Sequence, residues 1–234
     1  IHSGIAGHDA LIIRPEKGAL ERLPVQGDSL HTQNYQVSVK LTDTPQTEIK
    51  VECKSRLSQY EANASMLRKK LEERKDRIRK GIQLNRATLG EVEVIEASDP
   101  LPELTERYTL QAMYGNKNGN RLFIPVNPFR EEPFRLSKDN RKYAIHVNYG
   151  YLDKDTIRIS LPDGYQVETK PKDIDLIYPF GHIQSKIEVT GQELVITQSL
   201  LVNKGIYPVG KLNEFIAFSE AIKKAYNGKV VLKK

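Results

Sequence analysis

The ten residues EIKVECKSRL, positions 48–57, decide the class of fold because apolar and charged side chains alternate along them. Ile49, Val51, Cys53 and Leu57 fall on one side of an extended chain. Charged residues fall on the other side: Glu48, Lys50, Glu52, Lys54 and Arg56. Successive side chains of a β-strand point to opposite faces, so this period of two predicts a strand with one buried face.

The residues just before this run repeat its pattern. Tyr35, Val37, Val39 and Leu41 share one face, and the turn-rich segment TDTPQT, 42–47, separates the two runs. Two alternating runs joined by a short turn-rich connection predict an antiparallel hairpin.

After position 58 the period changes to that of a helix. Apolar residues recur at spacings of three, four or seven: Tyr60, Ala64, Leu67, Leu71, Ile78 and Ile82. This stripe predicts one long helix over about 59–82 that lies across a sheet. Ser58 and Glu61 fit a capping box at its start.

Strands resume after the helix, and a second helix is expected near the end. The candidate strands are 90–97, 106–115, 121–126, 143–152, 155–161, 165–170, 182–189 and 193–202. Asn213 can cap a helix over about 214–226, and Gly228 can end it. Because no strand–helix alternation repeats, we predict a mainly β protein: a large antiparallel β-sandwich with one inserted helix (59–82) and a C-terminal helix (214–226).

The connection at 127–142 bears on the number of domains. It is rich in Pro, Arg and Glu and lacks the Gly/Ser composition of a flexible linker. We therefore expect residues 1–234 to form a single sandwich domain; the alternative is two subdomains, 1–130 and 143–234. Because the chain begins with Ile1, not Met, we also expect a fragment of a larger protein.

The charge of the chain is concentrated in one segment. Residues 68–80 hold eight Lys/Arg and three Asp/Glu, which is +5 of the net charge of +6. We interpret this basic segment as the solvated face of the helix, held by i, i+4 pairs such as Lys69–Glu73, Glu73–Arg77 and Asp76–Lys80. The alternative is an independent interaction module that binds an acidic partner: a protein, a lipid head group or nucleic acid. Under that alternative, charge reversal at Arg74, Arg77 and Lys80 abolishes binding and leaves the fold intact.

Few residues suggest chemistry. Cys53, the one cysteine, lies in phase with Val51, so we interpret it as a core residue and not as a nucleophile. Asp173 and Asp175 would point to one side of a strand and could share a proton or a cation, but Lys170 and Lys172 supply neutral pairing.

The histidines show no metal-binding spacing, and His8 beside Asp9 is a weak signal: His2, His8, His31, His146 and His182. A metal site needs three or four convergent ligands. We therefore predict no catalytic, cofactor-binding or metal-binding residue. No apolar run approaches the ~20 residues of a membrane-spanning helix.

Several short motifs lie in the C-terminal part of the chain: LPDGY (161–165), FG (180–181), GIYP (205–208), EFIAF (214–218) and KVVLKK (229–234). With them, residues 159–234 resemble the C-terminal β-rich domain of unknown function in bacterial transglutaminase-like proteins, whose catalytic core is papain-like. The stretch ALIIRP…LERLP, 10–24, resembles the exit from that core.

The resemblance implies a non-catalytic accessory, structural or binding module. It would follow a transglutaminase-like catalytic domain in an exported protein of the periplasm or cell envelope of a Gram-negative bacterium. Those proteins use a Cys–His–Asp triad, and no position here matches it, so we do not expect an enzyme. The expected partners are that catalytic domain and a peptide, glycan or protein ligand; nucleic acid is not expected.

Overall fold

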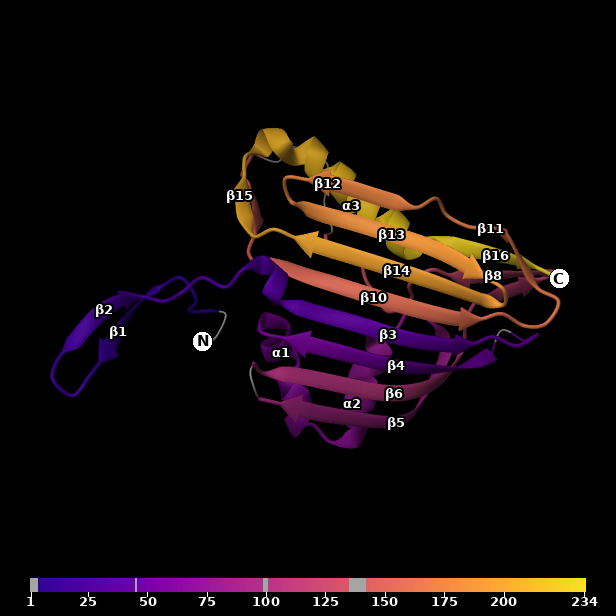
Figure 1. Cartoon of the computed structure of the whole chain (residues 1–234), viewed down its shortest axis with the longest axis horizontal. Helices are drawn as coiled ribbons and strands as arrows, with labels where there is room; N and C mark the ends of the chain where they lie inside the picture. The colour runs from indigo at the N-terminus through magenta and orange to yellow at the C-terminus, as the bar shows by residue number, and fades with distance from the viewer. Residues whose placement is uncertain (1–3, 45, 99–100, 135–141) are drawn as a thin grey trace.

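The computed structural model describes residues 4–44, 46–98, 101–134 and 142–234. It is mainly β, with 51% strand and 19% helix, which confirms the predicted fold class. The main feature is an eight-stranded sheet in the order β12-β13-β14-β10-β3-β4-β6-β5 (Figure 1). Its strands are β3 (Thr32–Lys40), β4 (Gln46–Arg56), β5 (Asn85–Ala97), β6 (Glu103–Met113), β10 (Tyr151–Ser160), β12 (Ile174–Tyr178), β13 (Gly181–Thr190) and β14 (Glu193–Val202).

The predicted hairpin is present as β3 and β4, with Val37 opposite Val51. The strands of the sheet pair antiparallel except β3 and β10, which run parallel. This parallel pair joins strands from the two halves of the chain, so one sheet runs through both. The prediction of one strand over 143–152 is wrong, because this range is divided between two strands. β9 covers only Ile145–Val147, and β10 begins at Tyr151.

A smaller sheet packs on one face of the large one. Its strands, in the order β11-β16-β8-β7, are β11 (Gln166–Thr169), β16 (Lys229–Lys233), β8 (Arg121–Pro125) and β7 (Asn116–Asn118). Ile49 and Ile157 of the large sheet share a core with Leu122 and Val230 of the small one, and each is at most 1% exposed. These are the two layers of the sandwich.

The C-terminal helix is confirmed as α3 (Leu212–Asn227), which packs behind β12 and β13 (Figure 1). Its aromatic side chains form a second core, in which the Phe180 and Phe215 ring centroids lie 4.7 Å apart. Asn213 is not the N-cap, because the helix already begins at Leu212. Short elements complete this end: β15 (Gly205–Tyr207), paired with β9, and η3 (Val209–Lys211).

The predicted long helix is wrong, because it is broken into α1 (Ser58–Asn63), η2 (Ala64–Arg68) and α2 (Leu71–Lys80). Lys69 and Lys70 are extended, with ψ of 147° and 156°. The break lets Met66 reach the core at 0% exposure, while Leu71, which the predicted stripe would bury, is 49% exposed. The three pieces lie on the same side of the sheet as the small sheet and contact β3–β6.

The predicted capping box does not form. Leu57 has φ of +52° and Ser58 is the first residue of α1, so its side chain makes no cap. Instead, the backbone N–H of Ser58 donates to Nδ1 of His31, 3.2 Å away. His31 lies just after η1 (Asp28–Leu30) and is buried, which lowers its pKa and keeps Nδ1 available as an acceptor.

The N-terminal hairpin, β1 (Asp9–Ile13) and β2 (Gly18–Arg22), projects away from the two-layer body (Figure 1). It forms a separate two-stranded sheet. The irregular connection predicted over 127–142 is described only in part. Residues 127–134 follow β8 without regular secondary structure, and residues 135–141 lie outside the described part of the chain.

Candidate functional site

Cys53 is a core residue, as predicted. Its side chain is 1% exposed, and burial raises the pKa of its thiol to about 12, with the Glu106 carboxylate adding to the effect. A thiolate is the nucleophilic form, so this thiol is held unreactive at neutral pH.

The histidines do not converge. His182 contacts Asp175 at 2.5 Å, His31 caps α1, and His8 and His146 line one cleft. His2 lies outside the described residues. Across the described ranges no group of three His, Cys, Asp or Glu side chains is placed to hold a metal ion.

Asp173 and Asp175 have separate partners. Desolvation opposes ionisation of Asp173, but hydrogen bonds from the Ile187 amide and Lys170 outweigh it and lower its pKa. The contact with His182 lowers the pKa of Asp175. Each carboxylate is therefore stabilised in its ionised form, and the two do not share a proton.

The basic segment is largely engaged with its own surroundings. Lys69 lies 3.8 Å from Glu73, as predicted, whereas Asp76 pairs with Arg79 at 2.7 Å. Arg74 donates to the Leu67 carbonyl at 2.9 Å.

Arg77 likewise turns towards α1 and η2, and donates to Ser65, Asn63 and the Ala62 carbonyl. Because these contacts hold α1, η2 and α2 together, we expect charge reversal at Arg74, Arg77 and Lys80 to lower stability as well as any binding.

A buried polar network joins β3, β10 and the segment after β8. The Arg130 guanidinium, 7% exposed, donates to both Asp155 oxygens at 2.8 and 2.9 Å. It also lies 2.9 Å from Asp153 Oδ2 and donates to Gln33 of β3 at 2.9 Å. Its centre is 4.8 Å from the ring centroid of Tyr35. Arg130 thus bridges the two parallel strands at the point where the halves of the sheet meet.

The network continues into the second layer. Asn127 donates to Asp155 at 2.9 Å and to Gln198 at 2.8 Å. Gln198 in turn donates to Ser185 at 3.0 Å and to the Ala225 carbonyl of α3 at 2.6 Å. Buried polar groups specify one arrangement when each has a hydrogen-bond partner. This series of hydrogen bonds therefore fixes β10, β13, β14 and α3 relative to one another.

Asp153 differs from the other members of this network, because one of its carboxylate oxygens lacks a hydrogen-bond partner. Its Oδ1 is buried and receives no hydrogen bond of normal geometry, although the Gln33 backbone amide acts on the same carboxylate. Desolvation raises the pKa of Asp153 to about 7, against the opposing effect of Arg130. At neutral pH this carboxyl therefore exchanges between its two protonation states.

Asp153 lines a cleft of about 390 Å³ beside the network. Four aromatic residues contribute to the wall: Tyr35, Phe129, Tyr151 and Tyr226. A concave, largely apolar wall with few polar groups is typical of a small-ligand site. A smaller cleft of about 140 Å³ shares Tyr35 and Phe129 with it and reaches Cys53 and Glu106.

The open face of the large sheet holds a shallow hollow of about 720 Å³. Lys50, Arg107 and Arg158 are among its lining residues. Arg107 pairs with Glu52 at 2.7 Å and with Glu93 at 3.5 Å. Because cations and acids are mixed and paired here, the hollow favours no single ligand charge.

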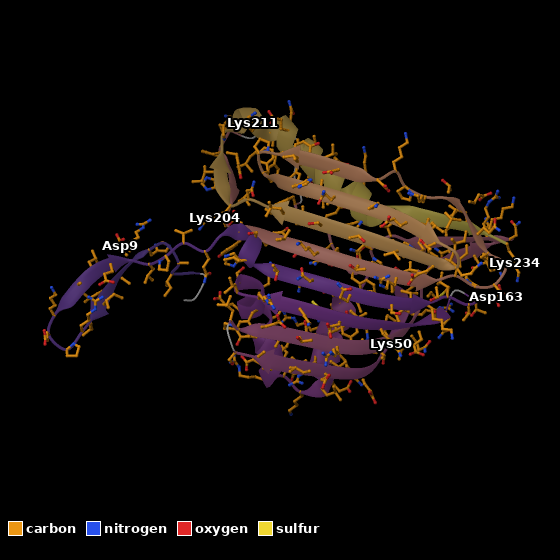
Figure 2. The ribbon with its side chains drawn as sticks, viewed as in Figure 1. Asp9, Lys50, Asp163, Lys204, Lys211 and Lys234 are labelled. Atoms are coloured by element: carbon orange, nitrogen blue, oxygen red, sulfur yellow. The ribbon has the colours of Figure 1, made fainter. Side chains whose placement is uncertain are left out.

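The N-terminal hairpin carries an apolar face. Leu11 lies opposite Leu20 in the register, and these side chains are 65% and 73% exposed. Ile13, in phase with Leu11, is 82% exposed. Asp9 and Arg22 pair at 3.4 Å at the end of this face nearest the body (Figure 2). A concentration of large exposed apolar side chains marks a surface that packs against another molecule or domain.

Comparison with known families finds a match in the C-terminal half of the chain. Residues 120–232 match the model of DUF3858, a domain of unknown function with solved structure. No curated protein matches the chain. The matched region extends from β8 to β16 and includes Arg130, Asp153 and Asp155. Gln33 and Tyr35 come from the residues before it, so the network joins the two parts.

Sequence reasoning missed the network. Asp153 and Asp155 lie in phase with Ile157 and Ile159, and acids on the buried face of a strand were a readable signal. Arg130 gave no such signal, because it lies in a connection without periodicity.

No helix in the described ranges combines the length and the apolar character needed to cross a bilayer.

Proposed function

We propose that this chain is a non-catalytic accessory module that packs against a transglutaminase-like catalytic domain and orients it. The apolar face of the β1–β2 hairpin carries the proposal, because Leu11, Ile13 and Leu20 are exposed on an element that projects from the body. An isolated two-stranded hairpin is marginally stable in water, so a partner surface would stabilise it.

The choice of partner rests on the family resemblance. Residues 10–24, which contain β2 and all of β1 except Asp9, resemble the exit from the catalytic core in transglutaminase-like proteins. The hairpin would then lie between the core and the sandwich. The DUF3858 match supports a distinct module without naming its partner.

Two observations support a non-catalytic role. The thiol of Cys53 is buried with a raised pKa, and no position corresponds to the Cys–His–Asp triad of the family. Export to the periplasm or cell envelope of a Gram-negative bacterium is part of the same proposal and is supported by the resemblance.

The test is a titration of the transglutaminase-like domain encoded in the same gene with this chain. A fully buried leucine contributes about 1.5–3 kcal/mol, so Leu11→Ser with Leu20→Ser should weaken binding by at least roughly tenfold. The matched control is Ala10→Ser with Ala19→Ser on the other face of the hairpin, which should bind like the wild type. Equal binding by both variants, or a gene without such a domain, overturns the proposal.

No specific observation favours the alternative, in which the basic segment, residues 68–80, acts as an independent interaction module. Five of its eight cations contact acids or backbone and side-chain acceptors nearby: Lys69, Arg74, Lys75, Arg77 and Arg79.

A further inference from the structure

We propose that the cleft beside Arg130 binds an alkylammonium group, with the Asp153 carboxylate as its counter-ion and the surrounding aromatic rings as its wall. The ligand class is a primary ammonium on an aliphatic stem, either a free amine or the side chain of a lysine in a polypeptide. This inference is independent of the hairpin contact.

The charge of the cleft favours a cation. Among the described residues that line it, the charged ones are Arg130, Glu131 and Asp153. Arg130 is already held by both oxygens of Asp155, which lies behind it in the network. Counting these four side chains, with Asp153 ionised, the site carries one positive and three negative charges, so an anion is disfavoured and a cation is attracted.

Asp153 has the capacity to accept from a ligand. It is 7% exposed, and only its Oδ2 is held by Arg130, at 2.9 Å. Oδ1 has no hydrogen bond of normal geometry. A buried carboxylate oxygen without a full set of donors is costly, and an ammonium group supplies up to three N–H donors.

The groups that face Asp153 are consistent with a cation site. They are Arg130 from the segment after β8, Asp155 and Tyr151 from the same strand, the amide of Gln33 from β3, and Tyr226 from α3. Arg130 is the one cation among these groups, and it already contacts an aromatic face in this site, that of Tyr35. Aromatic faces attract a second cation by the same quadrupole interaction.

The size of the cleft fits the ligand class. A volume of about 390 Å³ lies at the small end of the range for ligand pockets, which suits an aliphatic amine better than a large cofactor. The aromatic walls would contact the methylene stem, while the carboxylate holds the charged end.

The test is a titration of the whole chain with propylammonium and with Nα-acetyl-lysinamide. Binding is monitored by the chemical shifts of the backbone amides in NMR spectra. We expect saturable shifts near Gln33, Tyr151 and Asp153, with millimolar affinity for a probe this small. Tighter binding of the lysine derivative identifies a polypeptide side chain as the ligand, and tighter binding of propylammonium identifies a free amine. Propionate, the anion of similar shape, should not bind. Binding of propionate, or no saturable binding of either amine, overturns the proposal.

Two further measurements assign the site. Asp153→Asn should weaken binding by about tenfold or more, while the matched control Asp163→Asn, at an exposed turn, should bind like the wild type. In the wild type, affinity should fall as pH drops below about 7, because the protonated carboxyl carries no charge. This second readout needs no variant, so it stands if Asp153→Asn unfolds. Affinity that is unchanged with pH overturns the assignment to Asp153.

Discussion

Replacing Arg130 with methionine tests the network that joins the two halves of the sheet. The guanidinium contacts Asp155, Asp153 and Gln33, and its removal leaves two carboxyl groups buried without a cation. Removing one partner from a buried ion pair costs about 3–5 kcal/mol, because the other charge stays desolvated. For a chain of this length about 2–4 °C is lost per kcal/mol, so the melting temperature should fall by roughly 6–20 °C.

The assay is thermal and urea unfolding, both monitored by circular dichroism, at about pH 8 and about pH 5. The loss should be smaller at the lower pH, because protonation neutralises the two orphaned carboxyl groups. Arg158→Met is the matched control, since Arg158 is exposed and lies 3.7 Å from Glu193, and it should cost at most about 1 kcal/mol. The reasoning is refuted if Arg130→Met costs no more than this control, or if its cost does not change with pH.

Three other predictions concern single residues. The pKa of Asp153 is raised from 3.8 to about 7, so the folded state holds this proton more tightly than the unfolded state. The free energy of unfolding should therefore fall as pH rises from about 4 to about 7, and Asp153→Asn should flatten that part of the measured pH profile. The thiol of Cys53 should resist a thiol-specific reagent in the native protein and react in urea; rapid labelling of the folded chain would show that it is accessible. Arg77→Ala should cost about 1–3 kcal/mol in thermal unfolding because it removes donors to three groups, whereas Lys80→Ala, on an exposed position, should cost close to zero; equal costs would contradict the inward role of Arg77.

The strands were predictable because their period of two is strong. Ile49, Val51 and Cys53 alternate with charges, and no competing pattern overlaps them. The break in the helix was not predictable, because Lys69 and Lys70 are good helix formers and the extended link is favoured by tertiary contacts, among them the burial of Met66.

The site was only partly predictable for a related reason. Acids in phase with apolar residues of one strand, at 153 and 155, signalled a buried charge that needed a partner. The partner could not be assigned, because Arg130 reaches them from an irregular segment and its other contact, Gln33, lies 97 residues away. The parallel pairing of β3 and β10 was invisible for the same reason, since sequence patterns give the faces of a strand but not its neighbours.

The docking role of the hairpin is tested most directly by hydrogen exchange of the amides in residues 9–22. The measurement compares this chain alone with the polypeptide encoded by the complete gene. The account predicts rapid exchange of the cross-strand amides of Ala10, Ile12 and Ala19 in the chain alone and marked protection in the complete polypeptide, because covering the apolar face stabilises the hairpin whose hydrogen bonds hold these amides. Equal exchange in both would contradict it, since the hairpin would then have no partner in the protein to which it belongs.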